Sequence, residues 1–192
     1  MRVNRLLLGA CISSVMAVLP AAAARTAPRQ CVAAKPTPAS YTWNFQKETD
    51  GIFSDIQSAA AQARYHADKL QSFTWGEEVS WEGHASQLSQ LKADIDDMGG
   101  RLCRLETIRR VAAPWQQRII DRIATTVRLM ADNAQDAIVF ENNNHDYLWS
   151  PTYRKYTENL YQEATNLTHA MDHAVEYAKV HALDRQSTRT TS

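Results

Sequence analysis

The sequence has few of the residues that build tight turns and no excess of either charge sign. Six glycines and six prolines in 192 residues are too few for the many turns of a β-sandwich or barrel. The 21 Lys and Arg residues balance 21 Asp and Glu residues, which excludes a polybasic nucleic-acid-binding chain and an acidic disordered one. With 44% hydrophobic residues the balance is globular, and it favours a single all-α domain.

Motifs that would indicate chemistry are also missing. The sequence has no Cys-x-x-Cys-His for haem attachment and no Glu-x-x-His for a ferritin-like di-iron centre. It contains no His-Glu-x-x-His, no Gly-x-Ser-x-Gly and no phosphate-binding glycine loop. We therefore predict a protein without enzymatic activity or a cofactor.

The first 24 residues have the pattern of an export signal. Arg2 and Arg5 precede an apolar run over residues 6–19, and Pro20 is followed by four alanines. The run is shorter than the roughly 20 residues that a membrane-spanning helix needs, and no comparable run follows it. We predict cleavage after Ala24, a soluble periplasmic or secreted protein, and no transmembrane segment in the mature chain.

A lipoprotein is the alternative for this segment. Residues 8–11 read Leu-Gly-Ala-Cys, which is similar to a bacterial lipobox and would leave Cys11 as an acylated N-terminus. Only ten residues would precede Cys11, and apolar residues would remain behind it. Ordinary cleavage is the better interpretation.

Cleavage would leave two cysteines, Cys31 and Cys103, in an oxidising compartment. Their number predicts one disulfide bond. Two free thiols or a catalytic dithiol form the alternative, which the absence of Cys-x-x-Cys disfavours.

Beyond the leader, the hydrophobic spacing predicts an arm, four helices and a tail. Residues 25–40 contain three prolines and read as an extended arm. Apolar positions that alternate steps of three and four predict a bundle over residues 41–183, followed by a disordered tail at 184–192. The helices are expected at about 41–73, 77–111, 114–141 and 150–183.

Steps of three and four are those of knobs-into-holes packing. With short connections they predict an antiparallel up-down-up-down four-helix bundle with coiled-coil-like packing. The glycine pair Gly99-Gly100 lies inside the second helix without breaking its phase, and would either kink it or admit a close neighbour. The alternative fold is a two- or three-helix arrangement that completes its core by dimerising.

If the helices reverse near residues 75 and 112, His66, His84 and Glu141 lie in one polar layer near an end of the bundle. Two imidazoles and a carboxylate are ligands suited to a transition metal, and His145 or Asp136 would add another. The alternative function is thus a small metal- or cofactor-binding bundle. The simpler interpretation is a set of buried or hydrated polar residues that satisfy one another.

The same end gathers Trp75, Trp81 and Trp149. Tryptophans near bundle ends commonly plug the core, and the alternative is an exposed aromatic recognition patch. His169 and His173, spaced i, i+4 in the last helix, are expected on its solvent face. Together these features predict an exported binding or structural module of the bacterial cell envelope, with a protein partner as a candidate and no nucleic acid.

Overall fold

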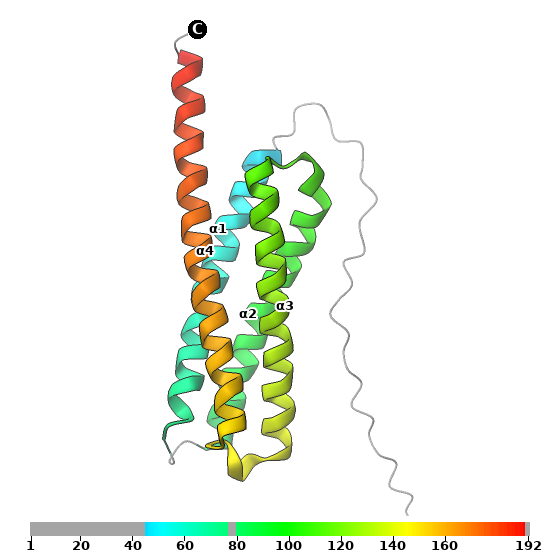
Figure 1. The fold of residues 1–192 in the computed structure, drawn as a ribbon, viewed down its shortest axis with the longest axis vertical. Coiled ribbons are helices and arrows are strands. Elements are labelled where there is room, and N and C mark those ends of the chain that lie inside the picture. Colours follow the sequence, from blue (N-terminus) through cyan, green and yellow to red (C-terminus); the bar gives the residue numbers. More distant parts are fainter. Residues whose placement is uncertain (1–44, 77–79, 191–192) are drawn as a thin grey trace, which may run out of the picture. The chain divides into compact units, whose positions relative to one another are not determined.

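The computed structural model describes residues 45–76 and 80–190. The predicted leader with Cys11, the arm with Cys31, residues 77–79 and the last two residues lie outside this range. Within the described part, the secondary structure is helical throughout, with no strand. The prediction of an all-α fold with four long helices is therefore confirmed (Figure 1).

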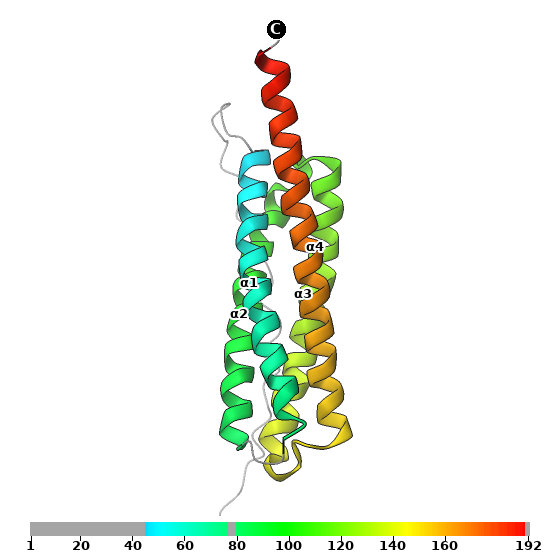
Figure 2. The same ribbon diagram turned by 90° about the vertical axis from the view of Figure 1, so that its left-hand side faces the viewer.

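The four long helices follow one another with short connections. They are α1 (Phe45–Phe73), α2 (Trp81–Ile108), α3 (Pro114–Asn143) and α4 (Pro151–Thr190). Two short 3-10 helices, η1 (Arg109–Val111) and η2 (His145–Tyr147), lie in the connections that precede α3 and α4. Helix α1 packs against α2 and α4, and α3 packs against the same two helices (Figure 2).

Prolines and polar side chains define where the last two helices begin. Pro114 and Pro151 occupy first-turn positions, where the missing N–H costs nothing. The Ala113 N–H donates to Oε1 of Gln116 at 2.9 Å, and the Tyr153 N–H donates to Oγ of Ser150 at 3.4 Å. These contacts satisfy backbone donors that have no partner inside the helix.

The apolar stripes form one shared core. Along α3 the predicted stripe is buried at every position. Phe53, Ala60 and Ala67 of α1 are buried in addition to the predicted stripe, because the covered face of a helix in a four-helix core is wider than a strict coiled-coil seam. Trp81, predicted as the first core position of the second helix, is instead 42% exposed.

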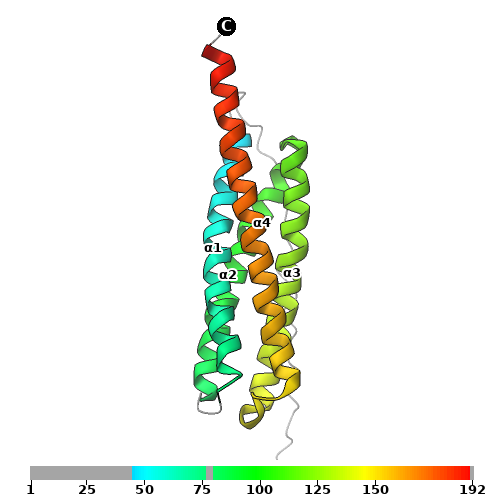
Figure 3. The ribbon, with the colours of Figure 1, turned by 60° about the vertical axis from the view of Figure 1, so that its left-hand side comes forward.

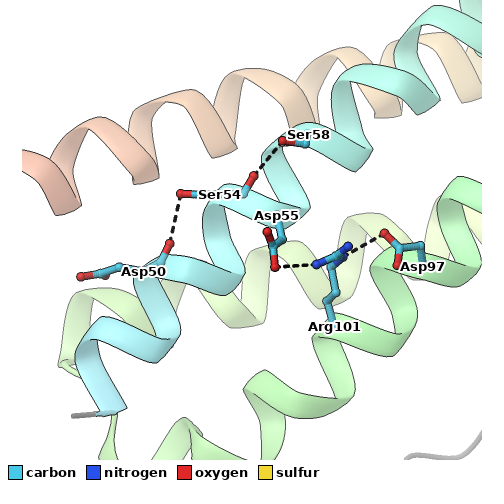
Figure 4. Close-up of polar contacts among 6 residues, drawn as sticks. All are labelled: Asp50, Ser54, Asp55, Ser58, Asp97 and Arg101. Carbon is cyan, nitrogen blue, oxygen red and sulfur yellow. Dashed lines mark hydrogen bonds and ion pairs between the residues drawn. The ribbon is translucent and has the colours of Figure 1, made fainter.

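Ion pairs join α1 to α2 on the outside of this core. Arg101 Nη1 lies 2.6 Å from Asp55 of α1, and its Nε lies 2.8 Å from Asp97 of α2 (Figure 4). Nearby, Arg104 pairs with Glu48. The guanidinium of Arg101 therefore bridges two helices, although such exposed pairs each stabilise a fold by less than about 1 kcal/mol.

Two details differ from the sequence prediction. Helix α4 continues to Thr190 and extends past the ends of the other helices, so residues 184–190 are not a disordered tail (Figure 3). That stretch has no glycine or proline to end the helix, and its polar composition alone is compatible with a solvated one. At Gly99 and Gly100, a Cβ would meet no heavy atom within 4 Å, so the glycines admit no close neighbour.

Among the described residues, no helix is both long and apolar enough to cross a membrane.

Candidate binding site at one end of the bundle

Two connections meet at one end of the bundle: the one between α1 and α2, and the one between α3 and α4. Arg154 Nε of α4 donates to the Thr74 carbonyl at the end of α1, at 3.2 Å. Trp81, the first residue of α2, stacks on His145 of η2 with ring centroids 4.4 Å apart and planes 6° apart. Side chains separated by up to 80 residues in the chain thus share one surface.

A pocket of about 520 Å³ lies at this end. Its walls are aromatic and aliphatic, with a few polar groups between them. The lining residues are Phe73, Gly76, Ser80, Trp81, His84, His145, Asp146, Leu148 and Trp149. An apolar pocket with a small number of convergent polar groups is the usual form of a small-molecule site.

Large aromatic side chains around the pocket are open to solvent. Trp75 is 69% exposed, Trp149 54% and Tyr147 58%. Three tryptophans, with Trp81 included, therefore do not plug the core as the simpler prediction had it. Their exposure matches the alternative, an aromatic patch on the surface, and aromatic residues are the side chains most enriched at recognition sites.

Positively charged or protonatable side chains already cover two of these rings. Arg154 lies over the ring of Trp75, 4.5 Å from its centroid, and His145 lies over Trp81. Trp149 differs: its Nε1 donates to the Asp146 carbonyl at 3.2 Å, and its ring contacts Tyr147 at 6.1 Å. Among the described residues, no cationic side chain lies over the Trp149 ring.

His84 lines the pocket and is buried to 2% exposure. Its ring packs edge-on against Phe73 at 5.7 Å and Tyr153 at 5.5 Å, and Nδ1 has no hydrogen-bond partner among the described residues. Burial lowers the pKa of His84 from 6.5 to about 4, because an imidazolium would lose its hydration there. The side chain is thus neutral at pH 7 and presents an unsatisfied nitrogen.

Two more buried polar groups lie behind His84. The Tyr153 hydroxyl and Oε1 of Glu141 have no hydrogen-bond partner among the described residues. Glu141 Oε1 lies 3.7 Å from Nε2 of His145, and burial raises the pKa of the Glu141 carboxyl. Burial also raises the pKa of the Tyr153 phenol, and the nearby charge of Glu141 adds to that shift. Unsatisfied buried polar atoms are rare, and a cluster of them marks a candidate site.

The predicted metal ligands do not come together. His66 Nδ1 is 3.0 Å from Gln87 Oε1, and its Nε2 is 3.9 Å from Asp94, so its contacts lie along α2 rather than toward His84. Across the part of the chain that the structure describes, no three His, Cys, Asp or Glu side chains are placed to hold a metal ion. The set His66, His84 and Glu141, with His145 or Asp136 added, is therefore not a metal centre in this geometry.

The remaining predicted residues lie away from this end. Cys103 is a half-buried residue of α2, and its proposed partner Cys31 is outside the described range, so the disulfide stays a prediction. His169 and His173 are exposed, as expected. His173 also lines a second hollow, about 440 Å³, between α3 and α4, together with Trp115, Arg118 and Arg122.

Sequence reasoning missed part of the pocket. Tyr153 was assigned to the core and His145 to a loop, yet their contacts with His84 and Trp81 shape the site. The aromatic signal was visible in the sequence, whereas the unsatisfied polar atoms depend on packing. Comparisons of this chain with protein-family models, with curated proteins and with solved structures found no match.

Proposed function

We propose that this chain is an exported, non-enzymatic binding module of the bacterial cell envelope, and that its binding site is the pocket between the two connections. The observation that carries the proposal is the exposed aromatic surface around a pocket whose wall holds the unpartnered nitrogen of His84. A folded chain stabilises itself by covering aromatic rings and pairing polar atoms. Leaving both unmet at one place indicates that a ligand or partner meets them.

The export part of the proposal depends on the leader pattern. A positive start, a 14-residue apolar run and a small-residue cleavage site together indicate secretion. In an oxidising compartment Cys31 and Cys103 would pair. The pairing of Arg104 with Glu48 supports this geometry, because it brings Cys103 level with the start of α1, where residues 25–40 join the bundle.

We further propose the antiparallel, up-down-up-down arrangement with coiled-coil-like packing. Contacts between α1 and α2 support it, since positions further along α1 pair with earlier positions of α2. Glu48 pairs with Arg104, Asp55 with Arg101, and His66 with Gln87. Antiparallel neighbours joined by short loops are the simplest topology for four such helices.

Site-specific photo-crosslinking in living cells of the source organism tests the proposal. A benzophenone amino acid would replace Trp149, Trp81 or, as the matched control, Leu129, which is 49% exposed on α3. We expect adducts from positions 149 and 81, read by intact mass so that small molecules and proteins both register. Position 129 should give none.

Equal adducts from all three positions would contradict the proposal, as would their absence at 149 and 81. Recovery of the crosslinked protein from the cytoplasmic fraction with its first 24 residues retained would overturn the export part.

A further inference from the structure

The pocket described above discriminates between ligands by charge, and its aromatic rings indicate which charge it accepts. Trp75 has the Arg154 guanidinium over its face, and Trp81 has the His145 imidazole over its own. An indole face carries a negative quadrupole and attracts a cation within about 6 Å. Trp149, which lines the pocket, has no such partner among the described residues and is half exposed.

Carboxylates surround the same space. Asp146 lines the pocket, and Glu141 approaches His145 from beneath. Glu82, on the first turn of α2, also interacts electrostatically with His145. Among the described lining residues there is no lysine or arginine, and the buried His84 is neutral at pH 7. An anion would therefore meet acidic groups without a fixed counter-charge.

The second hollow provides a contrast within the same molecule. Arg118 and Arg122 lie one helical turn apart on its rim, and neither forms an ion pair with a described residue. The two hollows thus differ in the sign of their charged groups, so the acidic and aromatic character of the end pocket is not a general property of this surface.

We propose that the end pocket binds an organic ammonium ion, with the positive group beside Asp146 and the Trp149 ring and the apolar body against Trp81, Phe73 and Leu148. The ammonium N–H groups also offer donors to the buried nitrogen of His84. This inference rests on the proposed function, because it assigns a ligand chemistry to the same site.

Three probes with one apolar body and different head groups test it. Cyclohexylmethylamine is protonated at pH 7.5, cyclohexylmethanol is neutral, and cyclohexanecarboxylate is negative. We expect isothermal titration calorimetry to show the amine binding about tenfold or more tighter than the alcohol, as cation–π contact and carboxylate attraction together imply. The carboxylate should bind more weakly than the alcohol.

Variants locate the effect, with the amine-to-alcohol affinity ratio as the readout because it cancels the shared ring. Trp149→Leu keeps an apolar side chain but removes the π face, and should lower the ratio at least threefold. Asp146→Asn should lower it by a similar factor. Trp75→Leu is the matched control, since that ring lies outside the pocket lining and under Arg154, and should leave the ratio unchanged.

The outcomes separate this inference from the proposed function. Equal binding of amine and alcohol, or tighter binding of the carboxylate, would overturn the ammonium assignment while leaving a working pocket. No binding of any probe, with crosslinks at position 149 retained, would do the same. A normal helical circular dichroism spectrum for each variant shows that loss of the ratio is not loss of the fold.

Discussion

At the residue scale, His84 couples the pocket to pH. Its pKa in the folded protein is about 4, whereas an unfolded chain would bind the proton near 6.5. The unfolded state therefore takes up a proton first as the pH falls, and the fold loses stability between about pH 6.5 and 4. The shift corresponds to about 3 kcal/mol when it is fully expressed.

We predict that His84→Phe abolishes this part of the acid sensitivity. Urea unfolding at pH 7 and pH 4.5 should show the wild type losing on the order of 2 to 3 kcal/mol more than the variant over that interval. His169→Phe, at an exposed position, is the control and should behave as wild type. An identical pH dependence for wild type and His84→Phe would refute the buried neutral state.

The same residue shows how far the site could be predicted. Placing His84 and Glu141 toward one end needed only helix lengths, and the stacking of Trp81 on His145 is consistent with that level. Placing His66 beside His84 failed because His66 meets Gln87, nearly one helical turn further along α2. A shift of three residues at one turn decides whether two side chains meet, and the sequence of a turn does not define its length that finely.

At the element scale, α2 carries two glycines that the helix does not require. Neither needs an unusual backbone, and a Cβ at either position would point into open space. Glycine in a helix interior costs roughly 0.5 to 1 kcal/mol relative to alanine, through the greater freedom of the unfolded chain.

We therefore predict that Gly99→Ala and Gly100→Ala each raise the free energy of unfolding by about 0.5 to 1 kcal/mol. Gly51→Ala in α1, equally unobstructed, should give a similar gain and serves as an internal comparison. Thermal or chemical unfolding measures the change. A loss of stability at position 99 or 100 would mean that the glycines meet a packing partner, as the sequence prediction had allowed.

The helices themselves were predictable because their signals are local. The stripe of α3 repeats at every turn, and prolines mark the starts of α3 and α4. Errors arose where the signal was weak. Trp81 continues the spacing of α2 but sits at its first residue, at the rim of the core, and the last turns of α4 have no apolar stripe to announce them.

At the scale of the whole molecule, one covalent bond would join the arm to the bundle. A disulfide between Cys31 and Cys103 closes a loop of about 70 residues, which the chain-entropy relation values at about 4 kcal/mol. We predict no reactive thiol in the unreduced mature protein. Reduction should lower the free energy of unfolding by up to that amount, and two titratable thiols before reduction would show that the bond is absent.

The central claim concerns the whole molecule as well: binding occurs at the end where the two connections meet. Hydrogen–deuterium exchange of the mature protein, with and without envelope extract from the source organism, tests it most directly. We expect slowed exchange at residues 73–76, 80–84 and 145–149, and little change elsewhere. Protection confined instead to the α3 and α4 residues around Trp115 and His173, or no protection at all, would contradict the claim.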